Sequence, residues 1–364
     1  MKVKIQKSVL LDALKKVQNI VPAKGSLPVL QNALLVAKDG KLAFTSTDLD
    51  LSIIADAPCE VLDEGSTTLP VKLLANAISK VVDGTVEIAV DEKDRAVVKA
   101  GTTVFRISGL DAKEFPTLPK ADESSIIEIQ QAVLKDMIKK TNYASSKDDT
   151  RRTLCGNLFA LKGGNLTVVA TDGRRLAVYE RPVEAAGEFE LVIPNKTIGE
   201  LLRNLNGEEP VRISIAKTQV VFELGTVKVY SKLMDDAYPN YRQVIPKETK
   251  YAASIDRQLL MDAIDRVSIF ATSDTGCQMK FKFAPGELSI NSTQTELGEA
   301  KDQVAIKYEG PEIEIFFNPF YLMDPLKEIG DDDVVVNLND GHSPAVVTVG
   351  SAAFKYVLMP LRIQ

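Results

Sequence analysis

The chain alternates between two kinds of hydrophobic pattern. In some stretches apolar residues recur every three or four positions, as at Leu10, Leu14 and Val17, which is the spacing of one face of an α-helix. In other stretches, such as 86–110, β-branched and polar residues alternate around short turn signals, which predicts antiparallel strands joined by hairpins. We therefore expect an α+β fold with helices on one face of antiparallel sheets.

The helical pattern occurs six times, and the copies fall into two sets of three. Equivalent residues of a set lie 124 to 126 positions apart, as at Leu10, Leu134 and Leu260. A spacing this long indicates a repeated domain, since solenoid repeats run about 20 to 50 residues. The predicted helices begin at Lys7, Gln131 and Arg257 in the first set, and at Leu69, Ile193 and Phe317 in the second.

The repeat is clearest in the stretch LTVVATDGRRLAVYERP, residues 166–182, where an apolar strand breaks into a polar turn and then resumes. Weaker copies begin at Leu42 and Leu288. Together with the helices, these copies predict three similar domains, each made of two β-α-βββ halves with two helices packed on antiparallel sheets. The predicted domains are residues 1–124, 125–250 and 251–364.

The segments between the predicted domains are also recognisable. Residues 110–125 and 233–250 each leave a strand, carry an aromatic residue followed by proline, and turn polar, which predicts extended linkers. The last stretch, YVLMPLRIQ at 356–364, stands where a third linker would begin. We expect an uncovered apolar tail there, which is typical of a binding site. The alternative is that this stretch is the last core strand.

Composition excludes several kinds of chemistry. Cys59, Cys155 and Cys277 are scattered without a CxxC spacing, so neither a disulfide framework nor a zinc site is indicated. His342 is the only histidine, which excludes histidine-based catalytic triads. The chain has no glycine-rich phosphate-binding motif, no signal peptide and no long apolar run. We expect a cytoplasmic protein without a cofactor, a metal or a membrane anchor.

Charge is unevenly distributed over a chain whose net charge is −6. Residues 1–124 carry 16 basic and 17 acidic side chains, residues 125–250 carry 19 and 16, and residues 251–364 carry 9 and 17. A protein this acidic is expected to bind nucleic acid on one face only. The predicted helices supply that face, because they carry Lys15, Lys16, Lys72, Lys80, Lys139, Lys140, Lys196 and Arg203 at recurring positions.

Several motifs along the whole chain resemble one known family. TSTDLDL at 45–51, ATDGRRLAV at 170–178, PNYRQVIP at 239–246 and the terminal YVLMPLR resemble the bacterial DNA polymerase III beta subunits, the replicative sliding clamps. The resemblance implies a head-to-tail homodimer whose six domains form a ring around duplex DNA. It also implies a processivity factor without catalytic activity, which slides without sequence specificity and is loaded by a separate clamp-loader ATPase.

The resemblance further assigns residues to the ring. Dimer contacts map onto Phe105 and Ile107 in the first domain and onto Ile269 and Phe270 in the third. The expected DNA-facing residues are Lys24, Lys72, Lys80, Lys139, Lys140, Arg151, Arg152, Lys196 and Arg203.

The resemblance also implies a pocket between the second and third domains, where the replicative polymerase and other replication and repair proteins insert a short apolar peptide. Methionine and leucine side chains suit such a pocket because they adapt to varied ligands. The matching residues are Leu154, Thr171, Gly173, Arg174, Arg175, Leu176, Pro239, Val244, Pro344, Val357, Leu358, Met359, Pro360, Leu361 and Arg362.

Two other functions are compatible with the residues alone. One is an enzyme acting on a small substrate in the groove between domains, with Asp172 as acid or base and Arg174 or Arg175 holding an anion. No nucleophile or second base accompanies these residues, which disfavours this reading. The other is a structural repeat scaffold that never meets DNA.

Overall fold

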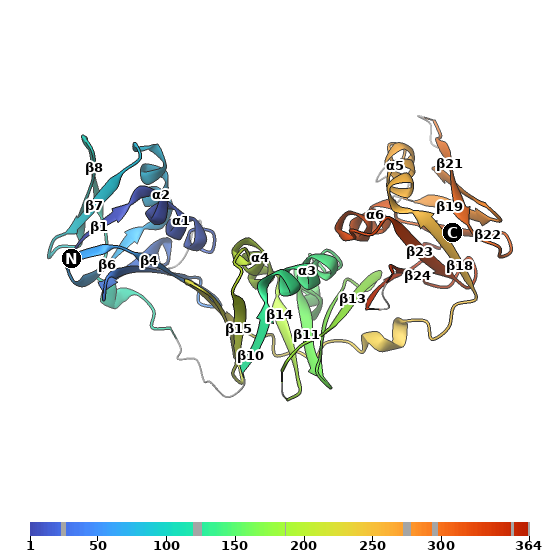
Figure 1. Ribbon diagram of the computed structural model, residues 1–364, viewed down its shortest axis with the longest axis horizontal. Coiled ribbons are helices and arrows are strands. Elements are labelled where there is room, and N and C mark those ends of the chain that lie inside the picture. Colours follow the sequence, from blue (N-terminus) through green and yellow to red (C-terminus); the bar gives the residue numbers. More distant parts are fainter. Residues whose placement is uncertain are drawn as a thin grey trace. The chain divides into compact units, whose positions relative to one another are not determined.

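The computed structural model describes residues 1–22, 27–118, 126–185, 187–271, 278–292, 298–350 and 353–362, without the side chain of Ile126 (Figure 1). Lys24, Cys277, Ile363 and Gln364 therefore lie outside the described residues. The chain divides into two compact units, which are described separately. The first comprises Met1–Lys135, Glu184–Ala186 and Gly199–Leu233, and the second comprises Asp136–Val183, Gly187–Ile198 and Met234–Gln364.

The first unit contains a complete β-α-βββ repeat followed by a second one, with the short strand β5 between them. Strands from later in the chain join it. Its elements are β1 (Lys2–Gln6), α1 (Lys7–Val17), β2 (Asn32–Lys38), β3 (Lys41–Thr47), β4 (Leu51–Pro58), β5 (Glu60–Asp63), β6 (Gly65–Pro70), α2 (Val71–Lys80), β7 (Thr85–Val90), β8 (Arg95–Ala100), β9 (Thr103–Ser108), β10 (Ile126–Gln130), β15 (Pro210–Ile215), β16 (Gln219–Leu224) and β17 (Val227–Lys232).

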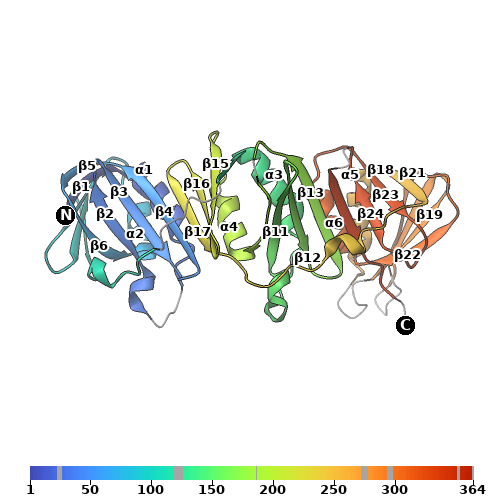
Figure 2. The ribbon, with the colours of Figure 1, turned by 90° about the horizontal axis from the view of Figure 1, so that it is seen from below.

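Two antiparallel sheets form this unit. One has the strand order β5-β1-β7-β8-β9, and the other has the order β10-β15-β16-β17-β4-β3-β2-β6. The larger sheet is continuous because β4 pairs with β17, and Figure 2 shows these two strands side by side. Helix α1 packs on α2 and β4, burying Leu10, Leu14 and Val17 as the helical spacing predicts.

The second unit repeats the same plan. It holds the remaining strands and helices, and α3 and α4 span the division between the units. Its elements are α3 (Gln131–Asn142), β11 (Gly156–Lys162), β12 (Asn165–Thr171), β13 (Arg175–Pro182), β14 (Phe189–Pro194), α4 (Asn195–Asn204), β18 (Tyr251–Asp256), α5 (Arg257–Ser268), β19 (Met279–Ala284), β20 (Glu287–Ser292), β21 (Lys301–Lys307), β22 (Ile313–Phe317), α6 (Pro319–Glu328), β23 (Asp333–Leu338), β24 (Ala345–Thr348) and β25 (Phe354–Leu358).

One antiparallel sheet runs through the second unit in the order β14-β11-β12-β13-β25-β24-β23-β18-β21-β20-β19-β22. Its continuity depends on the pairing of β13 with β25. Because β17 pairs with β4 in one unit and β13 pairs with β25 in the other, the predicted second domain contributes to both units. The predicted boundaries after residues 124 and 250 stay predictions.

The predicted α+β fold is confirmed, and the helix starts can be compared individually. The first set of helices begins at the predicted residues. The second set begins two residues late, because Leu69 and Ile193 are still paired in the sheet, with Ala33 and Asn157. Pro70 is consequently the last residue of β6 and directly precedes α2. Within the described parts of the chain, no helix is long and apolar enough to cross a membrane.

Candidate functional site

The predicted pocket is centred on the turn between β12 and β13. The Thr171 hydroxyl donates to the Arg175 carbonyl at 2.5 Å and accepts from the Gly173 N–H at 3.1 Å. One Asp172 carboxylate oxygen accepts from the N–H groups of Arg174 and Arg175 at 2.9 and 3.0 Å. Gly173 has a φ of +84°, a left-handed conformation that suits glycine. Side chains therefore close this turn without help from a ligand.

The weaker copy in the first domain forms the same turn. The Thr47 hydroxyl donates to the Leu51 carbonyl and accepts from the Leu49 N–H, while Asp48 accepts from the N–H groups of Asp50 and Leu51. Leu49 even shares the left-handed backbone, with a φ of +81°. The third copy of the turn falls outside the described residues. The sequence repeat therefore reflects a repeated hydrogen-bonded turn.

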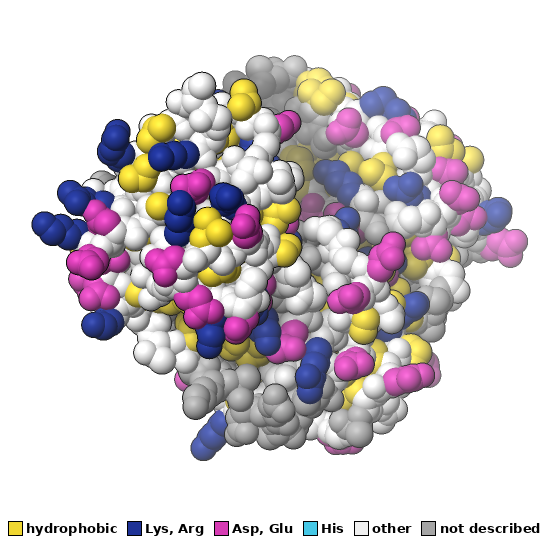
Figure 3. Space-filling model, turned by 60° about the vertical axis from the view of Figure 1, so that its left-hand side comes forward, with side chains coloured by type: hydrophobic (Ala, Val, Ile, Leu, Met, Phe, Trp, Pro, Cys, Tyr) yellow, Lys and Arg dark blue, Asp and Glu magenta, His cyan; other side chains and the backbone are white. Residues whose placement is uncertain are grey.

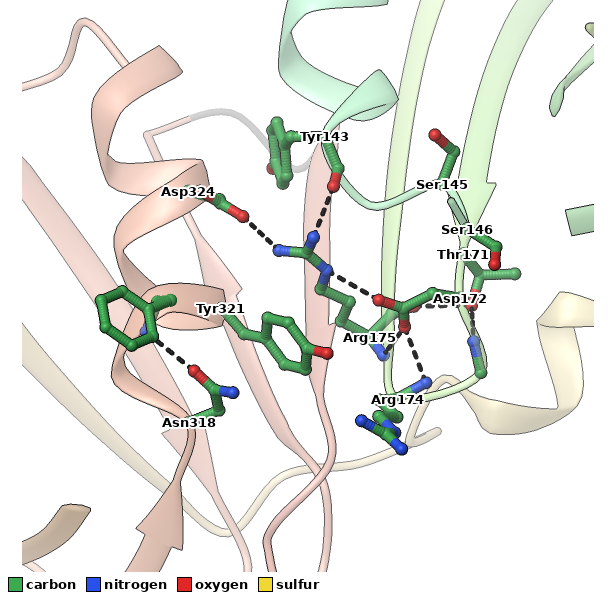
Figure 4. A network of polar contacts seen from close by, with 12 residues as sticks. Tyr143, Ser145, Ser146, Thr171, Asp172, Arg174, Arg175, Asn318, Tyr321 and Asp324 are labelled. Atoms are coloured by element: carbon green, nitrogen blue, oxygen red, sulfur yellow. Dashed lines mark hydrogen bonds and ion pairs between the residues drawn. The ribbon is translucent and has the colours of Figure 1, made fainter. Parts of the chain in front are cut away.

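Arg175 is the centre of a polar network in the second unit (Figure 4). Its Nε donates to Asp172 at 3.1 Å, one Nη donates to the Tyr143 carbonyl at 2.6 Å, and the other Nη pairs with Asp324 on α6. Its guanidinium also stacks 4.2 Å from the centre of the Tyr321 ring. Only 8% of Arg175 is exposed. This predicted pocket residue is thus almost completely buried and joins β13 to α6.

The electrostatics of this network keep it charged. Burial is the largest single effect and favours neutral Arg175. The hydrogen bond to Asp324 and the electrostatic effects of Tyr356, Asp324 and Asp172 together outweigh burial and raise the pKa of the guanidinium above its ordinary value. Burial also raises the pKa values of the Tyr143 and Tyr356 hydroxyls. Both carboxylate oxygens of Asp172 accept hydrogen bonds, one from N–H groups of its own turn and the other from the Arg175 Nε. The network is therefore structural, and Asp172 is not placed as an acid or base.

An apolar cluster lies next to the turn and contains two predicted pocket residues. Leu176 and Val357 are 2% and 1% exposed, so they form the floor and not the surface. Met234, Tyr238 and Ile245, from the linker after β17, pack partly buried against the cluster. The buried members of the cluster are Leu158, Val169, Leu176, Val178, Val192, Tyr241, Val346 and Val357.

Other predicted pocket residues reach the surface around this floor. Pro239 and Val244 on the linker are exposed, as are Gly173 and Arg174 on the turn. In Figure 4 the Arg174 side chain points away from the Arg175 guanidinium. The half-buried members are Leu154, Thr171, Pro344, Met359, Pro360 and Leu361, and Arg362 is exposed.

The expected uncovered tail is wrong for its first half. Tyr356, Val357 and Leu358 belong to β25, which pairs with both β13 and β24 and is almost completely buried. The alternative, a last core strand, holds for them because pairing with the preceding domain covers what a following domain would have covered. The Met359 N–H then donates to the Arg174 carbonyl at 3.0 Å, and the Leu361 N–H donates to the Phe316 carbonyl at 2.8 Å. Residues 359–361 are thus fixed but partly exposed.

Some of the predicted DNA-facing cations already interact with other groups of the chain. Lys72 donates to the Val21 carbonyl at 2.8 Å, and Lys140 pairs with Asp136 at 3.0 Å. Arg151 is exposed and reaches the Asp172 carbonyl at 3.3 Å. Figure 3 shows Lys and Arg side chains interspersed with Asp and Glu on the visible face. Arg203 is exposed but pairs with Glu200 on the same helix. Also exposed on helices or loops in the described chain are Lys80, Lys139, Arg152 and Lys196.

The predicted dimer residues differ in exposure. Ile269, which follows α5, is 74% exposed, and Phe270 is half-buried. Phe105 on β9 is half-buried, but Ile107 on the same strand is only 6% exposed. In the described chain β9 pairs with β8 alone and is therefore an edge strand. A dimer contact can use Ile269 and the β9 edge directly, whereas Ile107 supports that edge from inside.

Sequence reasoning missed three residues of the polar network. Tyr143 follows α3, while Tyr321 and Asp324 lie on α6, 149 residues beyond Arg175 in the case of Asp324. The sequence holds no pattern that connects them, because their proximity depends on the pairing of β13 with β25. The spacing of Tyr321 and Asp324 on one helix is the only available signal, since residues three apart share a face.

Comparisons with known proteins cover the whole chain. Family models of the DNA polymerase III beta subunit match in three parts: the N-terminal domain at residues 1–119, the central domain at 128–240 and the C-terminal domain at 242–362. The beta sliding clamp of Caulobacter vibrioides is 34% identical, with all of both chains covered. That of Chlamydia muridarum is 30% identical, also over all of both chains. A crystal structure of the sliding clamp from Pseudomonas aeruginosa bound to griselimycin superposes with a TM-score of 0.96 and 32% identity over the full length of both chains.

Proposed function

This chain belongs to the family of DNA polymerase III beta subunits and is a DNA sliding clamp, and from that premise we propose how its residues perform the function. Sliding clamps are processivity factors that hold a DNA polymerase on DNA and catalyse no reaction of their own. The small-substrate enzyme considered from the sequence has no support. We propose that the three domains are residues 1–124, 125–250 and 251–364, and that the protein works in the cytoplasm.

We infer that two copies close head to tail into a ring of six domains. The support is a repeated junction: β4 pairs with β17, and β13 pairs with β25, which are equivalent strands of successive domains. The remaining equivalents are β21 and β9. In the described chain β9 pairs only with β8, and β21 meets β18 only at its end, near Ile306. Pairing β21 of one copy with β9 of the other repeats the junction and closes the ring.

Exposed cations on the helices then face the DNA. Lys80, Lys139 and Arg203 are exposed, and acidic residues on the same helices, Glu200 paired with Arg203 and Asp136 paired with Lys140, limit the grip on DNA. Loose contact suits sliding, because each firmly neutralised phosphate adds salt-dependent affinity. Enclosure by the ring supplies retention without base contacts. The DNA-facing set assigned from the sequence is retained in this proposal, including Lys24, which lies outside the described residues.

Polymerase and other replication or repair proteins bind, in this proposal, through a short apolar peptide. The Leu176 and Val357 floor, the exposed Val244 and the half-buried Met359 provide apolar contacts beside a turn that is already closed. The buried Arg175 network supports the pocket and does not contact the peptide. A closed ring cannot be threaded onto circular DNA, so a clamp-loader ATPase must open it.

The ring is tested by the topology dependence of DNA binding. The chain is loaded onto nicked circular duplex DNA with a bacterial clamp-loader complex and ATP, and bound protein is separated by gel filtration. We expect retention on the circle and rapid loss once a restriction enzyme linearises it. The matched control combines Ile269→Ala with Phe270→Ala, which removes the apolar contact predicted at the dimer interface and should abolish retention on both forms. Equal release from circular and linear DNA would refute the ring.

A further inference from the structure

A groove runs beside the apolar floor on the same face of the same sheet. It has a volume of about 440 Å³, with linker residues 245–249 on one side and β23, β24 and β25 on the other. The strand register fixes its position. Val357 pairs with Val346, and Lys355, two residues along β25, pairs with Thr348. Because strand side chains alternate between faces, Val357 and Lys355 point to the same side. The residues that line it from β23 and β24 include Val335, Val346 and Thr348.

This linker groove is continuous with the proposed peptide pocket. Val346 and Ile245 belong both to the apolar cluster beneath the pocket and to the lining of the groove. An extended chain that fills the pocket can therefore continue along the sheet without leaving the surface.

The linker groove carries more positive than negative charge. It presents the ammonium groups of Lys247 on the linker and of Lys355 on β25, and only Lys355 belongs to residues 251–364, which carry 9 basic and 17 acidic side chains. Both lysines are exposed, and neither has an ion-pair partner in the described part of the chain. Glu248 is the one carboxylate among the groove's described lining residues. Because the two lysines outnumber this single carboxylate, the groove favours a negatively charged ligand.

We propose that the linker groove binds an acidic segment that flanks the apolar motif of a partner protein. The apolar side chains occupy the pocket beside Leu176 and Val357, and the flanking carboxylates lie over Lys247 and Lys355. The inference rests on the proposed peptide pocket and adds to it a second, electrostatic determinant of partner choice. Exposed charges of this kind are expected to raise affinity modestly and to lose their effect as salt increases.

The test compares labelled peptides by fluorescence polarisation with the full-length chain. The core probe is a pentapeptide with two leucines and a phenylalanine, used alone or extended at either end by four aspartates, four serines or four lysines. In about 50 mM salt, we expect one of the two aspartate peptides to bind roughly three- to tenfold more tightly than its serine counterpart. The lysine peptide should bind more weakly, and all differences should shrink at about 0.5 M salt.

Variants assign that gain to the groove. Lys247→Glu combined with Lys355→Glu should abolish or reverse the preference for aspartate over serine. Lys162→Glu makes the same charge change at the β11–β12 hairpin, outside the groove lining, and should keep the preference. Equal affinity for aspartate and serine peptides at both ends would overturn the inference while leaving the pocket intact, as would a preference that survives the double variant. If the core probe fails to bind, or still binds after deletion of residues 360–364, the pocket and the groove proposal both fail.

Discussion

The Thr-Asp turn occurs twice, at residues 47–51 and 171–175. The two copies lie at equivalent junctions and have the same backbone conformation. Each ends where a strand begins that pairs with the last strand of the next domain, β4 with β17 and β13 with β25. In each, the carbonyl of the fourth turn residue accepts an N–H at the end of the pairing strand, from the last residue of β17 in one copy and from the residue after β25 in the other. Asp50 accepts from Lys232 at 2.9 Å, and Arg174 accepts from Met359 at 3.0 Å.

The copies differ in the side chain at the last turn position. Leu51 is buried and stabilises the first junction through the hydrophobic effect. Arg175, at the same position in the second copy, is also buried but forms hydrogen bonds to Asp172, Asp324 and the Tyr143 carbonyl. We call the hydrogen-bonded turn the frame and the side chain at its last position, Leu51 or Arg175, the anchor. The same frame accepts either an apolar anchor or an ionic one. The frame preserves the fold, and the anchor decides which groups of the next domain are fixed beside it.

The largest expected effect breaks the ionic anchor. Arg175→Ala removes the guanidinium from the Asp172 and Asp324 carboxylates and from the Tyr143 carbonyl. Removal of one partner of a buried ion pair costs about 3 to 5 kcal/mol. Because Asp324 remains about one-third exposed, we expect about 3 kcal/mol, confined to the second unit. Native-state hydrogen exchange followed by mass spectrometry should show faster exchange in β13 and β25 with β4 and β17 unchanged.

The neighbouring Arg174→Ala is the matched control for that variant. Its side chain is exposed and points away from the network, so the change in unfolding free energy should stay within about 0.5 kcal/mol. If Arg174→Ala and Arg175→Ala destabilise the second unit equally, the guanidinium network is not what anchors the junction.

A smaller effect is expected from the third turn position, which is Gly173 in one copy and Leu49 in the other. Both residues have a left-handed backbone, so Gly173→Ala imposes a strain that the first copy already tolerates. The added Cβ meets only the end of the Arg151 side chain, at 3.4 Å. We expect Gly173→Ala to lower the unfolding free energy of the second unit by about 1 kcal/mol, measured by the same exchange experiment.

The mirror variant sharpens this prediction. Leu49→Gly relieves the strain in the first copy but makes the unfolded chain more flexible, and the two effects oppose each other. Its net change should lie within about 0.5 kcal/mol. A loss above 1 kcal/mol on Leu49→Gly would mean that the exposed leucine makes contacts that the shared turn does not explain.

The frame was predictable from the sequence, whereas the anchors were not. Helical spacing located all six helices, and the Thr-Asp pattern located the turn, because both depend on residues that are close in the chain. The late starts of the second helix set escaped prediction, since the pairing of Leu69 with Ala33 in the sheet overrides the local signal.

Long-range pairing explains what the local patterns did not show. Arg175 was assigned to the pocket from the sequence, but its burial was not foreseen, because only the approach of Asp324 on α6 makes that burial favourable. Likewise, the stretch from Tyr356 to Leu358 looked uncovered until β25 paired with β13. The linker groove was not predictable either, because Lys247 and Lys355 line one groove only when the linker crosses the sheet.

The smallest expected effect concerns the fourth turn position, where the first copy carries Asp50. Its carboxylate pairs with the Lys232 ammonium at 2.7 Å, but both side chains are mostly exposed. Exposed pairs contribute about 0 to 1 kcal/mol, and salt screens them. Lys232→Ala should therefore destabilise the first unit by no more than about 0.5 kcal/mol in low salt and by nothing measurable in about 0.5 M salt, while the backbone hydrogen bond from residue 232 to Asp50 persists.

Lys217→Ala, a change of the same kind on the β15–β16 turn, calibrates the measurement. A loss near 3 kcal/mol, matching Arg175→Ala, would mean that the first junction also depends on an ionic anchor, and the contrast between the two copies would disappear.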